Sequence, residues 1–197
     1  MMPLLALVVA YLVGGIPFGY LLVRLKSGED VRSMGSGNIG ATNVLRTSGR
    51  GVAVATLVLD IAKGFFAVWL AARLTGDSVT WTSLAALAVM AGHAYPVFLK
   101  FHGGKAVASF VGAFLYLTPI PLLATLVVFV IVVAATRQIS MGSIIAAAGL
   151  PLATWLIMHP PPPVILASLI AAVFIVSRHR ANIQRIRAGK EHVFRFK

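Results

Sequence analysis

Three polar segments interrupt an otherwise apolar chain of 197 residues. Each segment combines glycine or asparagine with basic side chains within it or shortly after it, and the three are Gly35–Asn43, Lys100–Lys105 and His179–Arg185. Fixed cations and backbone N–H groups are good ligands for phosphate. Because they stand between apolar runs, these residues indicate chemistry on a molecule with a phosphate head and an acyl tail, at one face of a membrane.

The first segment contains closely spaced glycines, which can expose successive N–H groups to an anion. It formally fits the dinucleotide fingerprint, but no strand precedes it and no βαβ unit surrounds it. A flexible polar loop is the alternative explanation. The guanidinium groups of Arg46 and Arg50 favour anion binding, because arginine makes bidentate bonds to phosphate. The predicted phosphate-binding residues here are Gly37, Asn38, Gly40, Thr42, Asn43 and Arg50.

The second segment, Gly103-Gly104-Lys105, precedes an apolar run. Its N–H groups and the positive end of the following helix dipole could therefore face an anion. Taken alone, the segment is better explained by a glycine turn followed by a lysine that sets topology. In the third segment, His179 and Asn182 lie at helical spacing among arginines, and a basic anchor for anionic lipid head groups is the alternative. The three segments together favour a functional site.

Asp60 and Lys63 are three residues apart inside the apolar run Val52–Ala72 and can face each other on a helix. Ionisable residues within a membrane span are functional suspects, because inserting each costs at least about 2.5 kcal/mol. Structural pairing beneath the polar segments is the favoured interpretation, so neither residue is assigned to catalysis.

Composition excludes most other classes of protein. Apolar residues make up 59% of the chain and charged residues 11%, too apolar a balance for a water-soluble domain. The net charge of +12 would suit a nucleic-acid binder, but the cations lie between apolar runs rather than along a soluble face. With no cysteine, disulfides, thiolate zinc sites and thioester intermediates are excluded. The histidines are scattered, so no metal or other cofactor is expected.

Seven apolar runs predict an all-α, integral membrane bundle of seven transmembrane helices in a single domain, residues 1–197. The runs are Pro3–Val23, Val52–Ala72, Val79–Leu99, Ala106–Leu117, Ile120–Ala135, Met141–Met158 and Pro161–Ser177. Pro119 and Pro121 predict a break between the fourth and fifth runs. With that break, almost all basic residues, including the whole basic tail, share one side of the membrane, and only Arg73 lies opposite. The positive-inside rule then places the N-terminus outside and the C-terminus in the cytoplasm.

The three segments resemble those of the bacterial acyl-phosphate:glycerol-3-phosphate acyltransferases, the PlsY family. The resemblance lies in the stretch from Gly35 to Arg46, in Gly92-His93 followed by the stretch from Lys100 to Ala108, and in His179-Arg180-Ala181-Asn182-Ile183 through Gly189-Lys190-Glu191. The segments occur in order and at suitable spacing, and the seven-span layout covers nearly the whole chain. Ala106 and Ala181 depart from the family, which commonly has glycine and a more polar residue there.

The resemblance implies transfer of an acyl group from acyl phosphate to the 1-hydroxyl of glycerol 3-phosphate. The products are lysophosphatidic acid and phosphate, in the first committed step of bacterial phospholipid synthesis. It also implies a multi-pass enzyme of the bacterial inner membrane with its active site facing the cytoplasm. A soluble enzyme that forms acyl phosphates is a candidate partner, beside the membrane lipids. By position, Ser36, Arg46, Lys105, His179 and Asn182 match the family's essential polar residues, and Gly40, Gly103 and Gly104 match its phosphate-binding glycines.

Acyl phosphates are already activated, so the protein needs mainly to hold two anions together and stabilise the developing oxyanion. Arg46 and Lys105 are expected to hold phosphate, Ser36 and Asn182 to orient reacting groups, and His179 to orient the hydroxyl or accept its proton. The donor's own phosphate is the alternative base. A covalent acyl-serine is disfavoured, because no arrangement of serine, histidine and acid is visible.

Two other functions are weaker explanations of the same residues. A carrier for a phosphorylated metabolite would need a path to the outer face, where the connecting turns lack cations. A membrane scaffold that recruits partners through the basic tail, Arg185–Lys197, leaves Ser36, Asn38 and Lys105 without a role.

Overall fold

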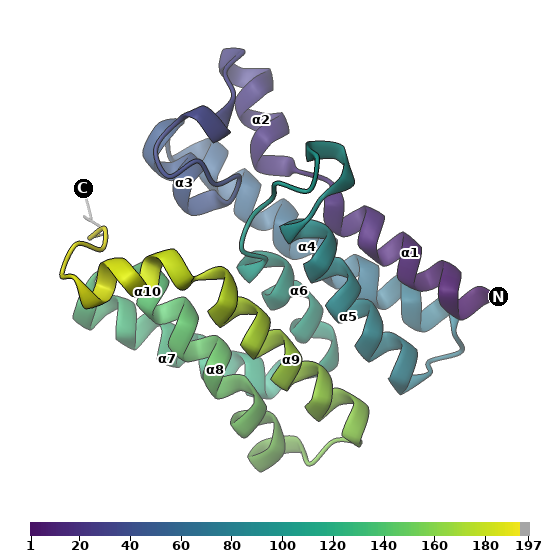
Figure 1. Ribbon diagram of the computed structural model, residues 1–197. Helices are drawn as coiled ribbons and strands as arrows, with labels where there is room; N and C mark the ends of the chain where they lie inside the picture. Colours follow the sequence, from purple (N-terminus) through teal and green to yellow (C-terminus); the bar gives the residue numbers. More distant parts are fainter. Residues whose placement is uncertain (194–197) are drawn as a thin grey trace. The chain divides into compact units, whose positions relative to one another are not determined.

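The computed structural model describes residues 1–193, and residues 194–197, the end of the basic tail, lie outside the described part. Residues 1–193 form α-helices and two short 3₁₀ helices, with no strand among them (Figure 1). The α-helices are α1 (Met2–Gly15), α2 (Phe18–Ser27), α3 (Ala41–Thr47), α4 (Arg50–Leu74), α5 (Val79–Ala94), α6 (Val107–Leu117), α7 (Pro119–Thr136), α8 (Ile139–Met158), α9 (Pro162–Arg178) and α10 (Arg180–Arg187). The 3₁₀ helices are η1 (Val31–Ser33) and η2 (Val97–Leu99). The predicted all-α class is confirmed.

The helices group into two compact units, Met1–Leu117 and Thr118–Lys197. The first unit holds α1 to α6 with both 3₁₀ helices, and the second holds α7 to α10. The boundary falls at the predicted proline break. Pro119 is the first residue of α7, a position that tolerates proline because the N–H groups of a first helical turn have no helical partner.

Glycines let the long helices of the first unit approach each other closely. A Cβ atom on Gly64 of α4 or on Gly112 of α6 would meet backbone oxygen of the facing helix. Gly14 of α1 and Gly92 of α5 make the same kind of contact between those two helices. Small residues are the usual means of packing helices in lipid, where large apolar side chains gain little by leaving the hydrocarbon.

The outside of the second unit carries large apolar side chains. Val130 and Ile131 on α7 are each 61% exposed, and Val173 on α9 is 70% exposed. An aqueous surface would leave these side chains unfavourably hydrated, whereas hydrocarbon solvates them. The exposed faces are therefore those of a membrane protein.

Five helical segments are long and apolar enough to cross a bilayer: Met2–Ser27, Arg50–Leu74, Val79–Leu99, Pro119–Thr136 and Ile139–Met158. A sixth is counted if α9 and α10, which are bent by 59° relative to each other, are taken as one span. The remaining predicted crossing corresponds to α6, which is apolar but only 11 residues long. By length and composition, the described residues thus provide five or six spans where the sequence predicts seven.

The first apolar run, Pro3–Val23, lies within the single candidate span Met2–Ser27, but its helix is interrupted between α1 and α2. Pro17 has no N–H and restricts the residue before it to extended conformations. Ile16 accordingly has ψ 114°, which ends α1. The run Val79–Leu99 is also interrupted near its end, because α5 stops at Ala94 and η2 follows. Both interruptions lead the chain towards a polar segment.

A small apolar core lies beneath the first polar segment. Its buried members are contributed by α2, η1, the loop itself, α3, α4 and η2, and they are Val23, Val31, Ile39, Val44, Ala53 and Leu99. Leu99 directly precedes the second polar segment, Lys100–Lys105. The core therefore fixes both polar segments of the first unit to the same group of helix ends.

Candidate functional site

The first polar segment is a loop held from inside by Asn43. Asn43 is 2% exposed, and its amide nitrogen donates to the carbonyl oxygens of Val31, Met34 and Asn38 at 3.2, 3.1 and 2.9 Å. Its amide oxygen accepts from the Ser36 N–H at 2.8 Å. All of these contacts stay within the loop and its flanks. Asn43 therefore sets the shape of the loop in this structure.

Several loop amides that the sequence suggested for anion binding donate within the loop instead. Besides Ser36 N, the Gly40 N–H donates to Asn38 Oδ1 at 2.8 Å and the Gly37 N–H donates to the Met34 carbonyl at 2.9 Å. Gly35 and Gly37 have positive φ angles, 57° and 70°, which glycine adopts without steric cost. The glycines thus serve the turn geometry, and side chains are better placed than these amides to bind an anion.

The cations and hydroxyls of this region lie around the loop. Ser36 is exposed within it, and Thr42 is half-buried in the first turn of α3. Arg46 is exposed in the last turn of the same helix, and Arg50 is exposed as the first residue of α4. Lys26 at the end of α2 donates to the Ser48 carbonyl at 2.9 Å, which ties the helix before the loop to the turn after α3.

The second polar segment packs directly on the end of α5. The Gly104 N–H donates to the His93 carbonyl at 3.1 Å, and the Gly103 N–H donates to the Ala94 carbonyl at 3.2 Å. A Cβ atom on Gly103 would meet the His93 carbonyl oxygen, and one on Gly104 would meet the His93 imidazole. The two glycines are therefore required for close packing, and these N–H groups are already bonded to the protein. Lys105, half-buried just before α6, is the charged group this segment offers.

Ala106 has a positive φ of 61° although it is not glycine. It is fully buried between Lys105 and α6. A left-handed conformation costs an L-residue roughly 1–2 kcal/mol. Glycine would adopt this conformation without that cost.

His179 lies in the second unit, at the bend between α9 and α10. It is 2% exposed, and its Nδ1 lies 2.8 Å from the Ile175 carbonyl oxygen. A carbonyl oxygen can only accept, so Nδ1 carries the hydrogen and Nε2 is the basic nitrogen of the ring. The bend between the two helices thus fixes both the orientation and the tautomer of His179.

Asn182 is held by a buried carboxylate that the sequence analysis did not single out. Glu191 Oε1 accepts from Asn182 Nδ2 at 2.7 Å and from Ser140 Oγ of α8 at 2.9 Å. Glu191 Oε2 accepts from Arg185 Nε at 2.8 Å. Burial opposes ionisation of Glu191, but the three hydrogen bonds outweigh it, so the pKa of this carboxyl is lowered. Its sequence signal was weak, since Glu191 follows a turn nine residues after Asn182.

The predicted site residues therefore form two groups. The first unit holds the Gly35–Asn43 loop, Arg46, Arg50 and Lys105, and the second unit holds His179 and Asn182. Among residues 1–193, no group of three or more His, Cys, Asp or Glu side chains could hold a metal ion. What these residues offer is fixed cations, hydroxyls, the carboxamides of Asn38, Asn43 and Asn182, and one basic imidazole nitrogen.

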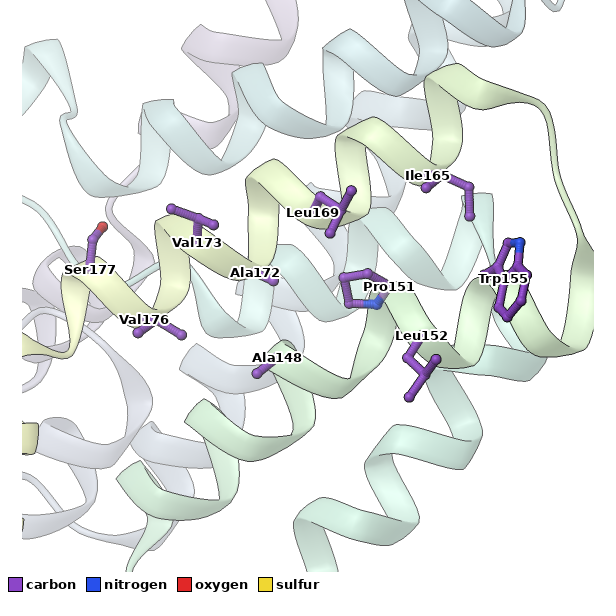
Figure 2. A pocket seen from close by; sticks show the side chains of 10 residues that line it. All are labelled: Ala148, Pro151, Leu152, Trp155, Ile165, Leu169, Ala172, Val173, Val176 and Ser177. Atoms are coloured by element: carbon purple, nitrogen blue, oxygen red, sulfur yellow. The ribbon is translucent and has the colours of Figure 1, made fainter.

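The second unit also has an open apolar groove of about 760 Å³. Its walls come from α8 and α9, and Figure 2 shows Ala148, Pro151, Leu169 and Ala172 among the side chains that line it. Along α9 it extends to Ser177, two residues before His179. An apolar surface thus leads up to a polar group of the proposed site.

Comparison with known proteins finds one family whose members match residues of both units. The family model described as "Glycerol-3-phosphate acyltransferase" matches residues 4–189. A glycerol-3-phosphate acyltransferase of Geobacter sulfurreducens is 49% identical over 95% of each chain, and one of Gloeobacter violaceus is 46% identical over 92% of this chain and 90% of its own. The crystal structure of PlsY, an integral membrane glycerol 3-phosphate acyltransferase, is similar in its glycerol 3-phosphate form, with a TM-score of 0.92 and 36% identity over 98% of this chain and 96% of that one. Its lysophosphatidic acid form has a TM-score of 0.88 and 35% identity, covering 98% of this chain and 95% of that one. With a family match through nearly its whole length and relatives close to half identical, the chain belongs to the glycerol-3-phosphate acyltransferase family.

Proposed function

We propose that this chain is the membrane enzyme that transfers an acyl group from acyl phosphate to the 1-hydroxyl of glycerol 3-phosphate. The single observation that carries the proposal is the family match over residues 4–189, which includes all three polar segments. The similarity to PlsY in glycerol 3-phosphate and lysophosphatidic acid forms supports both the acceptor and the product. Acyl phosphate as the donor is consistent with that family, and the reaction belongs to phospholipid synthesis.

Both groups of polar residues are proposed to serve the same reaction, in a single acyltransferase domain, residues 1–197. Arg46 and Lys105 bind phosphate groups, with Arg50, Thr42 and the loop glycines as further phosphate-binding candidates. Ser36 and Asn182 orient the reacting groups by hydrogen bonds. The division of labour follows from charge, since guanidinium and ammonium groups bind phosphate more strongly than neutral donors do.

In the proposed step, the acceptor hydroxyl oxygen attacks the acyl carbonyl carbon. The new ester C–O bond forms, the bond from the carbonyl carbon to the phosphate oxygen breaks, and phosphate leaves with its electron pair. The hydroxyl proton passes to His179 Nε2 or to the departing phosphate. The hydrogen bond from Nδ1 to the Ile175 carbonyl supports a role for Nε2, because it leaves that nitrogen as the basic one.

We also propose the predicted topology: seven crossings of the bacterial inner membrane, an outer N-terminus, and a cytoplasmic C-terminus and active site. The seventh crossing requires α6 to count as a short span. Its support is the charge pattern, since basic residues lie within or next to all three polar segments, whereas Arg73 in the last turn of α4 is the one assigned to the opposite side. A soluble enzyme that supplies acyl phosphate is the proposed partner at this face.

The proposed reaction is tested by purifying the chain in detergent and measuring release of inorganic phosphate from acyl phosphate. Release that requires glycerol 3-phosphate is expected of an acyltransferase. Reconstituted vesicles that instead take up glycerol 3-phosphate without consuming acyl phosphate would identify a carrier. If neither activity is found, the scaffold explanation gains support and the proposed reaction is rejected.

A further inference from the structure

Four buried polar side chains inside the first unit have no part in the proposed site. They are Asp60 and Lys63 on α4, His93 on α5 and Ser109 on α6, and each is at most 5% exposed. Ionisable groups within membrane helices are costly and usually serve a function. A buried ion pair is weak evidence for a purely stabilising role, because apolar side chains of similar volume often stabilise as well.

Lys63 links α4 to the break between α1 and α2. Its Nζ lies 2.8 Å from Asp60 Oδ1 and donates to the carbonyl oxygen of Ile16, the residue that ends α1, at 2.7 Å. The same ammonium group lies 5.6 Å from the centre of the Phe18 ring at the start of α2. The lysine thus fixes the direction in which α2 leaves the membrane helix before it.

The start of α2 in turn contacts the first polar segment. A Cβ atom on Gly19 would meet the carbonyl oxygen of Ile39, which lies within the Gly35–Asn43 loop. The loop backbone therefore rests directly on the first turn of α2. A shift of the α1–α2 break would move this loop, because no side chain lies between them to absorb the change.

His93 links the same ion pair to the second polar segment. Its Nδ1 lies 3.8 Å from Asp60 Oδ1 and 3.3 Å from Ser109 Oγ. The other side of the ring packs against Gly104, since the three atoms nearest to a Cβ placed there are all imidazole atoms. One imidazole thus connects the charges in the membrane helices with the glycine next to Lys105.

Asp60 Oδ1 is the atom that the two neighbouring groups share. Lys63 Nζ lies 2.8 Å from it, and His93 Nδ1 lies 3.8 Å from it. Its position, facing His93 and Lys63 together, suits an electrostatic link between the two.

We propose that Asp60, Lys63 and His93 form a positioning network that holds both polar segments of the first unit in the geometry needed to bind a phosphate group. Lys63 acts on the Gly35–Asn43 loop through the start of α2, and His93 acts on the Gly103–Lys105 segment through Gly104. The three side chains are positioning residues, because they act through these segments. The inference rests on the proposed function, which supplies two phosphate-bearing reactants, glycerol 3-phosphate and acyl phosphate.

The first test replaces the ion pair by apolar residues in the double variant Asp60→Leu/Lys63→Met. No unpaired charge is left, so the variant is expected to fold, as judged by its elution volume and melting temperature in detergent. We expect the KM for a phosphate reactant to rise about tenfold or more while kcat changes less than about threefold. Measuring KM separately for each reactant identifies which phosphate the segments hold. The matched control is Asp77→Asn, which removes the exposed ion pair with Arg73 at the other end of α4 and should leave both KM values unchanged.

The second test is a double-mutant cycle of Gly104→Ala and His93→Asn. Gly104 does not have a positive φ, and the three atoms nearest to an alanine Cβ there all belong to the His93 ring. In the wild-type background, Gly104→Ala should raise the KM for a phosphate reactant about tenfold. In the His93→Asn background, where the ring is gone, the same substitution should raise this KM less than about threefold. Ser83→Ala, which removes a buried hydroxyl elsewhere on α5, is the control.

The outcomes separate the network from the reaction. If the wild-type protein shows no acyl transfer, the proposed function fails whatever the variants do. If the wild-type protein is active, unchanged KM values in the folded apolar double variant overturn the network. Strictly additive effects of Gly104→Ala and His93→Asn overturn its His93 branch in the same way.

Discussion

Arg46 and Lys105 are the two cationic side chains proposed to bind phosphate groups. Arg46 is presented by the last turn of α3 after the Gly35–Asn43 loop, and Lys105 follows a glycine pair packed on α5. Each is preceded by a segment whose backbone hydrogen bonds are made internally. The positions of the charges are therefore set before any substrate binds, which is what preorganised binding of an anion requires.

Replacing either cation by alanine is expected to abolish most of the activity without unfolding the protein. A charge-assisted hydrogen bond contributes about 1.5–3 kcal/mol, which corresponds to roughly a 10- to 150-fold loss in kcat/KM. Steady-state assays of purified Arg46→Ala and Lys105→Ala measure this loss. Arg73→Ala, which removes an exposed arginine at the other end of α4, is the control and should retain full activity. Wild-type rates in both site variants would contradict the assignment.

Glu191 gives the folded state a dependence on pH. Hydrogen bonds hold its pKa below the ordinary 4.5, so the ionised carboxylate stabilises the fold above that pH, and the stabilisation is lost as pH falls through the lowered pKa. We expect Glu191→Gln to lower the melting temperature at neutral pH by on the order of 5 °C, with the difference shrinking below about pH 4.5.

The control for this measurement is Glu29→Gln, which neutralises an exposed carboxylate and should shift the melting temperature little at any pH. A constant difference between wild type and Glu191→Gln across the acid range would show that its charge does not stabilise the fold.

Sequence reasoning singled out side chains suited to the proposed chemistry but did not foresee how the glycines beside them are used. Arg46 and Lys105 are expected to hold phosphate and Ser36 to orient a reacting group, and these roles stay predictions. The glycines were expected to present N–H groups, whereas the structure uses Gly103 and Gly104 for close packing on α5. Periodicity cannot distinguish these uses, because both need a residue without a side chain. Glu191 and His93 were not assigned roles, since their partners lie far away in sequence or on another helix.

At the scale of elements, breaks in helices position the proposed site. The break at Pro17 turns the chain from α1 into α2 and then into the first polar loop. The bend of 59° between α9 and α10 places His179 where two helices meet. A hydropathy window reports only that the flanking residues are apolar, so it predicted the first run without its break. Pro17 was the local signal, as Pro119 and Pro121 were for the break that was predicted.

The groove between α8 and α9 is expected to take the acyl tail of the donor (Figure 2). From Ile165 to Ser177 it follows α9 for about 18 Å, comparable to the roughly 15 Å of hydrocarbon in one leaflet. We expect Ala148→Phe, a change at an exposed position that lines the groove, to shift the preference towards shorter acyl phosphates. The shift is measured as kcat/KM for a series of acyl chain lengths. For the longest donor, kcat/KM should fall about tenfold relative to wild type.

Leu166→Phe is the control for the groove, because Leu166 is exposed on α9, one of the two helices that form the groove, but does not line it. If both variants keep the wild-type profile of chain lengths, the tail binds elsewhere.

For the molecule as a whole, composition and charge were sufficient to predict an all-helical membrane protein. The number of crossings was harder to predict, because α6 is apolar but too short to meet the usual length of about 20 residues. The division into two compact units was not predicted either, since the proline break at its boundary resembles an ordinary turn. Sequence patterns describe segments one at a time, whereas units are defined by packing between segments.

The proposed topology is testable because the chain contains no cysteine. Single cysteines at exposed positions can be introduced as Glu29→Cys, Asp77→Cys, His159→Cys and His192→Cys. In intact cells, a membrane-impermeant maleimide should label the cysteines at 77 and 159, and those at 29 and 192 only after the membrane is opened. Labelling of position 29 or 192 from outside would refute a cytoplasmic site.

The most direct measurement is the product balance of the purified chain supplied with acyl phosphate and glycerol 3-phosphate. Acyl transfer between two bound phosphate compounds requires that lysophosphatidic acid and inorganic phosphate form in equal amounts, and that neither forms when one reactant is omitted. We predict this equality. Phosphate released without lysophosphatidic acid, or lysophosphatidic acid formed only from an acyl thioester, would contradict the account.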